Sequence, residues 1–242
     1  MSTDVLVQPV DSADDFTQIH HCFSEAFGRQ IQESIWLGMN PNWDSPEGQR
    51  KGAFKLLTRW QSITTNKDGQ PNTVILKATL PDPQDKTKRK IVGAAIWFQS
   101  SFVDGYGDPP TDCPAGLETL APTEGRFLRQ MYRSAWNRRV SITREKVNSD
   151  PPAIFILDIC AVDPAFQRRG VAKKLVEWGI EDAKRRGELE CMTEASTMGR
   201  GLYKMLGFEA EGSKEDTVFE IDEEFRNRNM PGWLIMRTWA SQ

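Results

Sequence analysis

The stretch from Phe155 to Phe208 limits the fold more than any other part of this 242-residue chain. Phe155–Val162 is nearly continuous in apolar residues, as is typical of a strand that is buried on both faces. Apolar residues then recur at helical spacing from Val171 to Arg186. Glu190–Ala195 predicts a second strand, and Gly201–Leu206 predicts a short helix. Strand, helix and strand in this order predict an α/β unit.

The turn at residues 167–172 (Gln-Arg-Arg-Gly-Val-Ala) predicts an anion site. A helix N-terminus carries unpaired N–H groups and a partial positive charge. Gly170 lets the backbone approach an anion closely, and Arg168, Arg169 and Lys173 would add positive charge. The alternative is that Gly170 only permits tight packing of strand and helix and that the arginines are solvated. The turn follows a strand and opens a helix, the context that phosphate binding requires, but the turn by itself leaves both alternatives open, and the tyrosine-bearing segment downstream favours phosphate binding.

These residues also carry a family resemblance. Gln167-x-x-Gly170-x-Ala172 resembles the acetyl-CoA signature of the GNAT N-acetyltransferase superfamily, Q/R-x-x-G-x-G/A. Residues 202–208 (LYKMLGF) resemble the later LY-x-x-LGF motif of the family, in the same order along the chain. The likeness is greatest to fungal-type members, in which residues 194–196 and 199–200 also have counterparts. It is specific over 155–208, moderate over 1–27 and 73–100, and weak over 101–152 and after 212.

The resemblance implies that acetyl-CoA, as the acetyl donor, lies where the central strand and its next neighbour splay apart. The backbone of residues 160–162 would pair with the pantetheine arm like an added strand. The N–H group of Val162 would polarise the thioester carbonyl. Many relatives place an asparagine where this chain has Ser196, whose hydroxyl could replace that contact. The implied cofactor contacts are Cys160, Ala161, Val162, Gln167, Arg168, Arg169, Gly170, Val171, Ala172, Lys173, Ser196 and Tyr203.

Tyr203 is the first candidate catalytic residue. Transfer to an amine expels CoA as a thiolate, and a tyrosine hydroxyl can donate the proton that the thiolate needs. The position of Tyr203 matches the general acid of the family. The alternative is a half-buried aromatic side chain that packs beside Leu202 and Leu206.

Asp158 and Glu194 are candidates for the general base. Asp158 is a carboxylate inside an apolar strand, where burial would raise its pKa toward a useful range. Alternation would place it on the same face as Ile156 and Cys160. Either carboxylate could instead be structural, satisfied by backbone N–H groups or by an arginine. Attack by a Cys160 thiolate is disfavoured because no histidine lies nearby in the sequence, so direct transfer in a ternary complex is expected.

Composition limits the partners. A hydrophobic fraction of 38% suffices for a core, and charged residues at 27% fit a soluble surface. The formal net charge of −3 gives no basic footprint for nucleic acid. No apolar stretch is long enough to cross a bilayer, and the first residues do not resemble a signal peptide. We therefore expect a cytoplasmic protein without nucleic-acid or membrane partners.

Cysteine and histidine usage limits disulfides and metals. The four cysteines are scattered and form no Cys-x-x-Cys pair: Cys22, Cys113, Cys160 and Cys191. His20 and His21 are the only histidines. This pattern predicts free thiols and no metal site.

The rest of the chain predicts one domain over residues 1–242, in the α/β (α+β) class that the GNAT resemblance implies. We expect a mixed, mostly antiparallel twisted sheet of about six to seven strands flanked by helices, with residues 101–152 as a probable insertion. Further strands are predicted at Val5–Pro9, Thr73–Leu80, Ile91–Gln99, Thr217–Ile221 and Trp233–Thr238. Further helices are predicted after Asp11 with an end at Gly28, at Gly48–Ser62, and from Arg126 to about Val147.

The acceptor is the least constrained feature. The fungal-type resemblance favours a small-molecule amine over a protein or peptide amine, and a longer acyl-CoA or a non-catalytic CoA sensor stays open. Four tryptophans could line an aromatic pocket: Trp36, Trp43, Trp97 and Trp136. Glu33, Glu118 and Asp104 could recognise a cationic amine. The protein could be a monomer or a homodimer.

Overall fold

The computed structural model describes residues 4–114, 116–212 and 216–238. Within these residues, seven strands form one sheet with the order β1-β2-β3-β4-β5-β7-β6. The strands are β1 (Leu6–Pro9), β2 (Thr73–Pro81), β3 (Arg89–Ser100), β4 (Ile154–Val162), β5 (Cys191–Ser196), β6 (Glu209–Ala210) and β7 (Trp233–Arg237). All neighbouring pairs are antiparallel except β4 and β5, which are parallel. The predicted mixed, mostly antiparallel sheet is confirmed.

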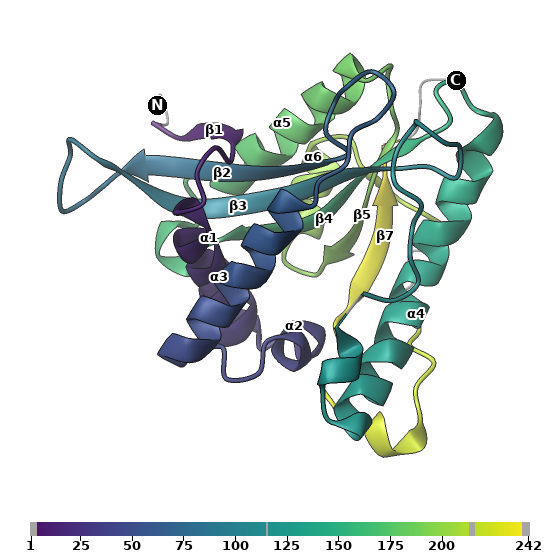
Figure 1. Cartoon of the computed structure of the whole chain (residues 1–242), viewed down its shortest axis with the longest axis horizontal. Helices are drawn as coiled ribbons and strands as arrows, with labels where there is room; N and C mark the ends of the chain where they lie inside the picture. Colours follow the sequence, from purple (N-terminus) through teal and green to yellow (C-terminus); the bar gives the residue numbers. More distant parts are fainter. Residues whose placement is uncertain (1–3, 115, 213–215, 239–242) are drawn as a thin grey trace.

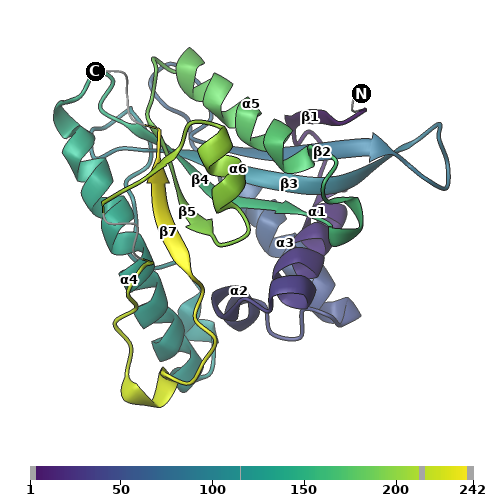
Figure 2. The same cartoon turned by 180° about the vertical axis from the view of Figure 1, so that it is seen from behind.

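Helices cover both faces of the sheet (Figures 1 and 2). The helices are α1 (Asp15–Phe23), α2 (Ser34–Met39), α3 (Pro46–Gln61), α4 (Pro122–Glu145), α5 (Val171–Arg185) and α6 (Arg200–Met205). Short 3-10 turns occupy Leu117–Thr119, Lys146–Asn148, Pro164–Phe166 and Glu223–Phe225. Helices α1 and α3 lie on one face, α5 and α6 lie on the other, and α4 runs beside β7. None of the helices in the described ranges is both long and apolar enough to span a membrane.

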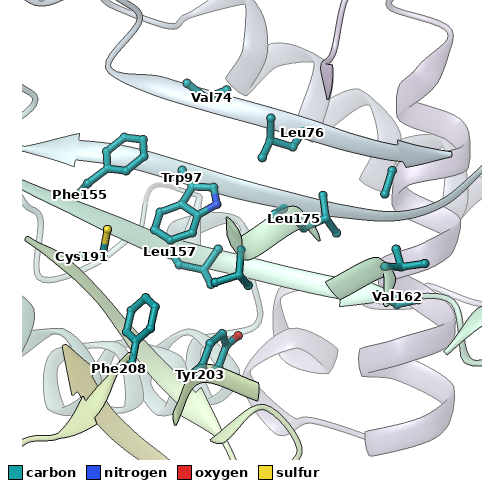
Figure 3. Close-up of a cluster of buried hydrophobic side chains, with 14 of the residues drawn as sticks. Val74, Leu76, Trp97, Phe155, Leu157, Val162, Leu175, Cys191, Tyr203 and Phe208 are labelled. Carbon is teal, nitrogen blue, oxygen red and sulfur yellow. The ribbon is translucent and has the colours of Figure 1, made fainter. Parts of the chain in front are cut away.

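The largest core cluster lies between the sheet and α5 (Figure 3). Trp97 of β3 stacks on Phe155 of β4, with ring centroids 5.2 Å apart. Both side chains are fully buried, and each such burial stabilises the fold by roughly 1.5–3 kcal/mol. This packing holds α5 against the sheet, with its N-terminus beyond the carboxyl end of β4.

A β-bulge interrupts β4 at Asp158. Ile96 of β3 pairs with Ile159, but the next residue, Trp97, pairs with Leu157. Asp158 is therefore the extra residue on β4. A bulge bends its strand and redirects the side chains that follow it.

The bulge corrects one prediction about β4. Asp158 and Ile156 both face α4, as alternation predicts. Cys160, however, packs with Leu157 and Tyr203 in the cluster under α5, so its predicted place beside Asp158 is wrong. The physical reason is that the extra residue reverses the in-and-out alternation of the strand.

The pairing of strands β4 and β5 ends at Leu157, the residue before the bulge. Their pairing covers only residues 155–157 of β4 against residues 191–193 of β5. The Thr193 hydroxyl donates to the Leu157 carbonyl at 3.0 Å, at the last paired position. Beyond it, Cys160 on β4 and Ser196 on β5 both border cavities. The predicted splay of the central strand pair is confirmed.

The predicted helix end at Gly28 is wrong. The helix continues past α1 as a π-helical segment, Ser24–Ile31, and ends at Gln32, which has a left-handed backbone with φ of 54°. A Cβ on Gly28 would lie 2.7 Å from Trp36 and 2.8 Å from Trp43. Glycine is required here by the close approach of two indole rings, within a helix that goes on.

The predicted strand at Thr217–Ile221 is also wrong. This segment is not a strand and runs beside α4, where the Glu220 N–H donates to the Ser134 hydroxyl at 2.9 Å. Phe219 and Ile221 pack against the apolar cluster at the start of α4. The alternate apolar residues of this segment are packed as the pattern predicts, but they pack against α4 and not within the sheet.

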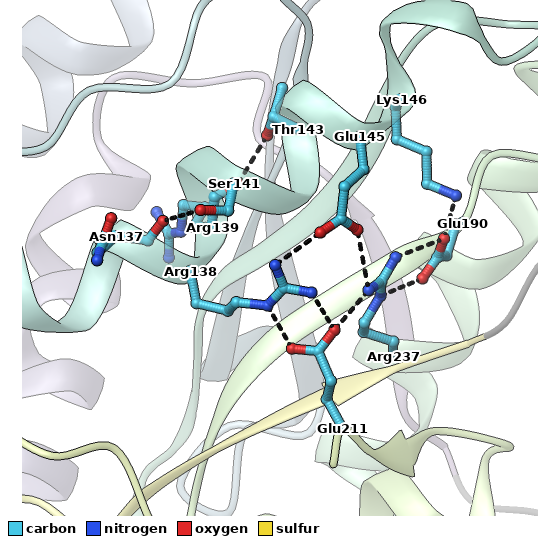
Figure 4. Close-up of polar contacts among 10 residues, drawn as sticks. All are labelled: Asn137, Arg138, Arg139, Ser141, Thr143, Glu145, Lys146, Glu190, Glu211 and Arg237. Atoms are coloured by element: carbon cyan, nitrogen blue, oxygen red, sulfur yellow. Dashed lines mark hydrogen bonds and ion pairs between the residues drawn. The ribbon is translucent and has the colours of Figure 1, made fainter.

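An ionic network fastens α4 to the last strands (Figure 4). Arg138 of α4 and Arg237 of β7 each donate to Glu211 at 2.6 Å. Arg237 also donates to the buried Glu190. None of the residues in this network lines either of the cavities described below.

Candidate functional site

Two cavities open where β4 and β5 diverge. One, of about 540 Å³, lies at the N-terminus of α5. The other, of about 310 Å³, lies among α1, α2, α3 and α4. Phe27, Cys160, Ser196 and Tyr203 line both, so the two cavities meet at these four residues. We name them the α5 cavity and the aromatic cavity.

The turn before α5 forms one end of the α5 cavity. Arg168 and Gly170 both have left-handed backbones, with φ of 61° and 79°. A Cβ on Gly170 would meet nothing within 4 Å, so glycine is required by the backbone and not by crowding. A turn that leads into a helix N-terminus in this way presents N–H groups to an anion. The residues present therefore fit a phosphate-bearing ligand.

The implied cofactor contacts gather in this cavity. Every one of them lines it except Arg169, whose guanidinium lies over the Phe166 ring at 5.3 Å. The sequence thus brings residues of β4, the turn, α5, β5 and α6 to one place. Gln30 of the π-helical segment joins them through a pair of amide hydrogen bonds with Gln167, at 2.9 and 3.2 Å.

The backbone of Val162 faces away from β3. The Asp163 N–H donates to Val92 of β3 at 2.9 Å, and in an antiparallel pair such bonds alternate along the strand. Alternation therefore turns the N–H groups of Val162 and Cys160 toward the side where β5 has diverged. The Val162 carbonyl accepts from the Gln167 amide at 3.2 Å, which agrees with this direction.

Substitution of Gly170 tests the turn. We expect Gly170→Ala to weaken CoA binding about tenfold, because a left-handed alanine costs roughly 1–2 kcal/mol and the turn would relax away from its present shape. Calorimetric titration with CoA measures the change. Gly207→Ala is the matched control: Gly207 has φ of 88° and open space around it, but it lies outside both cavities. Equal losses of affinity in the two variants would contradict the prediction.

Tyr203 of α6 packs in the core and also reaches both cavities. Its ring lies 5.7 Å from that of Phe208, beside Leu157 (Figure 3). The side chain is nine-tenths buried, at 8% exposure. Burial raises the pKa of the phenol well above its ordinary value. Tyr203 therefore keeps its proton at neutral pH, as a proton donor must.

Asp158 does not have the raised pKa that the sequence predicts. Burial alone would raise it, but the guanidinium groups of Arg59 and Arg139 outweigh burial and hold the pKa below its ordinary value. Arg59 donates to Asp158 at 2.9 Å, and Arg139 donates at 3.0 Å. The structure thus supports the alternative of an aspartate satisfied by arginine. The argument that burial makes Asp158 a better base therefore fails, because an ion-paired carboxylate is a weaker proton acceptor.

Glu194 is paired in the same way. The Nε and Nη2 atoms of Arg139 donate to its two oxygens at 3.0 and 2.6 Å. Both side chains of this pair are only 5% exposed. Glu194 therefore lies in the wall of the aromatic cavity as part of an ion pair, and not as a free carboxylate.

The thiol of Cys160 has a raised pKa. It is among the residues that line both cavities, and burial raises its pKa to about 12. The thiolate form that nucleophilic attack requires is therefore scarce at neutral pH.

The aromatic cavity carries one carboxylate without a cationic partner. Glu33 accepts N–H bonds from Ile35 at 3.0 Å and Trp36 at 2.8 Å, and no lysine or arginine of the described residues pairs with it. Burial raises its pKa. The surrounding aromatic side chains are Phe23, Phe27, Trp36, Tyr132, Trp136 and Trp233.

Only some of the residues that were predicted to surround the acceptor line the aromatic cavity. Trp36, Trp136 and Glu33 line the aromatic cavity, as the sequence suggests. Trp97 is instead fully buried in the core under α5. The remaining candidates, Trp43, Glu118 and Asp104, are not among the residues that line either cavity.

Comparison with known families matches a segment that contributes part of this site. Residues 131–208 match the model of the acetyltransferase (GNAT) family. The match covers 78 of the 242 residues of the chain. It runs from α4 through β4, the turn, α5 and β5 to the end of α6. A comparison with curated proteins finds no match.

Solved structures show that the whole chain has the GNAT fold. An arylalkylamine N-acetyltransferase from Aedes aegypti is 18% identical, with a TM-score of 0.59, 98% of this chain covered and 100% of the other. A polyamine N-acetyltransferase from Drosophila melanogaster is 14% identical, with a TM-score of 0.60 and 97% of each chain covered. A histone acetyltransferase-related structure from Corynebacterium glutamicum is 20% identical, with a TM-score of 0.54, 99% of this chain covered and 98% of the other.

Arg139, like Arg59 and Gln30, belongs to the candidate site but was not predicted from the sequence. It lies inside the matched segment, on α4, and its neighbours at helical spacing are the buried Ala135, Ile142 and Thr143. A charged residue on the buried face of an amphipathic helix is costly unless it is paired. That position was a signal in the sequence, although its partners could not be named from it.

Proposed function

We propose that this protein is an acetyl-CoA-dependent N-acetyltransferase that moves an acetyl group to a primary amine of a small molecule. The observation that carries the proposal is the meeting of two chemically different cavities at Tyr203 and Cys160. One cavity offers a helix N-terminus to phosphates, and the other offers aromatic walls to an organic acceptor. Acyl transfer requires a donor and an acceptor to meet in this way.

The donor would occupy the α5 cavity. The turn at Arg168 and Gly170 would hold the diphosphate, and Lys173 would add positive charge. The pantetheine arm would lie along residues 160–162, whose outer backbone groups are left unpaired by β5. The Val162 N–H would polarise the thioester carbonyl.

The chemistry is direct transfer. The amine nitrogen attacks the thioester carbonyl, a C–N bond forms, and the C–S bond breaks. Tyr203 donates its phenolic proton to the departing sulfur. The attacking nitrogen releases its own proton to solvent, because Asp158 and Glu194 are held in ion pairs, and Tyr203 regains its proton from solvent.

The acceptor would occupy the aromatic cavity. Its volume of about 310 Å³ suits a small molecule, and its aromatic side chains suit an apolar or aromatic body. Glu33, as a partly buried carboxylate that no described lysine or arginine pairs with, would attract the ammonium group. The named activities of the solved neighbours, on arylalkylamines and polyamines, are consistent with this class. The fungal-type subtype and cytoplasmic location stay predictions.

Thiol release from acetyl-CoA tests the proposal. The purified protein would be assayed with arylalkylamines, polyamines, agmatine and a peptide that carries lysine and a free N-terminus. Release that depends on a small amine supports the proposal, and release with the peptide alone would assign a protein acetyltransferase instead. CoA binding without release for any amine would indicate a sensor, and absence of CoA binding would refute both.

Removal of Cys160 separates direct transfer from an acetyl-enzyme route. We expect Cys160→Ala to keep kcat within about threefold of wild type, because a thiol with a pKa of about 12 is not the nucleophile. Steady-state kinetics with the best amine from the panel measures it. A loss of more than about a hundredfold, with CoA affinity preserved, would support the acetyl-enzyme route.

A further inference from the structure

Arg139 stands at the point where β4 and β5 separate. The last paired residues are Leu157 and Thr193, and the next residue on each strand is an acid. These acids, Asp158 and Glu194, would lie side by side in a buried place, where like charges repel. Arg139 places one guanidinium between them and bonds both, with N–O distances of 2.6 to 3.0 Å.

The guanidinium is fixed from several directions. Its carbon lies 4.8 Å from the Trp136 ring centroid and 5.3 Å from that of Phe98. Arg59 of α3 completes the cluster by pairing with the second oxygen of Asp158. Two positive and two negative groups thus balance, and helices α3 and α4 both hold the bulge residue.

We propose that Arg139 is a positioning residue that keeps β4 and β5 apart, so that the Cys160 and Val162 N–H groups stay open to the donor. The inference rests on the proposed function for its catalytic meaning. A guanidinium that bonds one carboxylate on each strand fixes the distance between the two strands at the residue where their pairing ends. Without it, pairing extends past Leu157 and Thr193 and closes the channel against Cys160.

The test removes the Arg139 guanidinium without leaving a buried charge unpaired. The double variant Arg139→Met/Glu194→Gln retains the Arg59–Asp158 pair and deletes the bridge between the strands. The matched control is Arg138→Met/Glu211→Gln, which removes an ion pair from the same helix at residues that line neither cavity. Both variants are compared with wild type for thermal unfolding, amide hydrogen exchange and CoA affinity.

The amide hydrogen exchange measurement needs no ligand, and it tests directly whether Arg139 keeps β4 and β5 apart. In the Arg139→Met/Glu194→Gln variant we expect the Cys160 amide to exchange at least about tenfold more slowly than in wild type, because β5 pairs with it. The control variant should leave that rate unchanged. An unchanged Cys160 rate in a folded Arg139→Met/Glu194→Gln variant would overturn the proposal.

CoA affinity then tests the consequence for binding. We expect affinity to fall at least about tenfold in the Arg139→Met/Glu194→Gln variant and to stay within about twofold in the control. Slower exchange with wild-type affinity would overturn the positioning role. If wild type itself binds no CoA, the proposed function fails, whereas the exchange result still decides whether Arg139 separates the strands.

A second substitution covers the case in which the double variant does not fold. Arg139→Lys keeps the charge but replaces a planar fork with a single ammonium, which cannot bridge both carboxylates in the same geometry. It should show the same slower Cys160 exchange and weaker CoA binding, to a smaller degree. Wild-type behaviour of Arg139→Lys in both measurements would overturn the proposal.

Discussion

Replacing Tyr203 with phenylalanine should lower kcat by roughly 10²- to 10⁴-fold, the usual contribution of a general acid. The CoA dissociation constant should stay within about threefold of wild type, because only the hydroxyl group is removed and the buried ring keeps its packing. Because burial raises the pKa of Tyr203, the wild-type enzyme should not lose this proton as pH rises through neutrality. Thiol-release kinetics and calorimetry measure the two quantities.

Tyr132→Phe is the matched control for this prediction. Tyr132 is a partly buried tyrosine whose pKa is also raised by burial, and it lines the aromatic cavity but not the α5 cavity. The same loss of one hydroxyl there should leave kcat within about fivefold of wild type, although the acceptor KM can change. Equal losses of kcat in Tyr132→Phe and Tyr203→Phe, or wild-type kcat in Tyr203→Phe, would refute the role of Tyr203 as the acid.

Arg139→Met alone should destabilise the protein by about 3–5 kcal/mol, the typical cost of removing one partner from a buried ion pair. The substitution leaves Glu194 without a cation and Asp158 with only Arg59. Adding Glu194→Gln to Arg139→Met should restore most of the loss, because the unpaired charge is removed. Urea unfolding at neutral pH measures both variants. No recovery in the double variant would mean that the loss comes from packing instead of charge.

The loss caused by Arg139→Met should also shrink in acid. The folded-state pKa of Asp158 lies below its ordinary value of 3.8. A carboxylate with a depressed pKa stabilises the fold above its ordinary pKa, and that stabilisation disappears as pH falls through the folded value. Unfolding measured at neutral pH and near pH 3 would show this convergence of wild type and variant. A pH-independent difference would contradict the assigned charge pairing.

Most of the strands, the helix α5 and the glycine turn before it were predictable because their signals are local. An apolar run, a 3.6-residue period and a glycine before a helix act through neighbours within a few residues. The same local reading placed a strand at Thr217–Ile221, where alternation is satisfied by α4 instead. The same signals predicted a helix end at Gly28, but the glycine is required there by the close approach of two indole rings and not by the end of a helix.

The sequence by itself determined the α/β unit, the glycine turn before α5 and the place of Tyr203 after β5. Only the tertiary structure decided the chemistry of the carboxylates. Arg139 lies 19 residues from Asp158 and 55 from Glu194, and Arg59 lies 99 residues from Asp158. The pKa of a buried acid depends on which charges lie within a few ångströms of it, and those charges come from distant helices. A bulge of one residue likewise depends on pairing with another strand, and it moved Cys160 to the face that carries Tyr203.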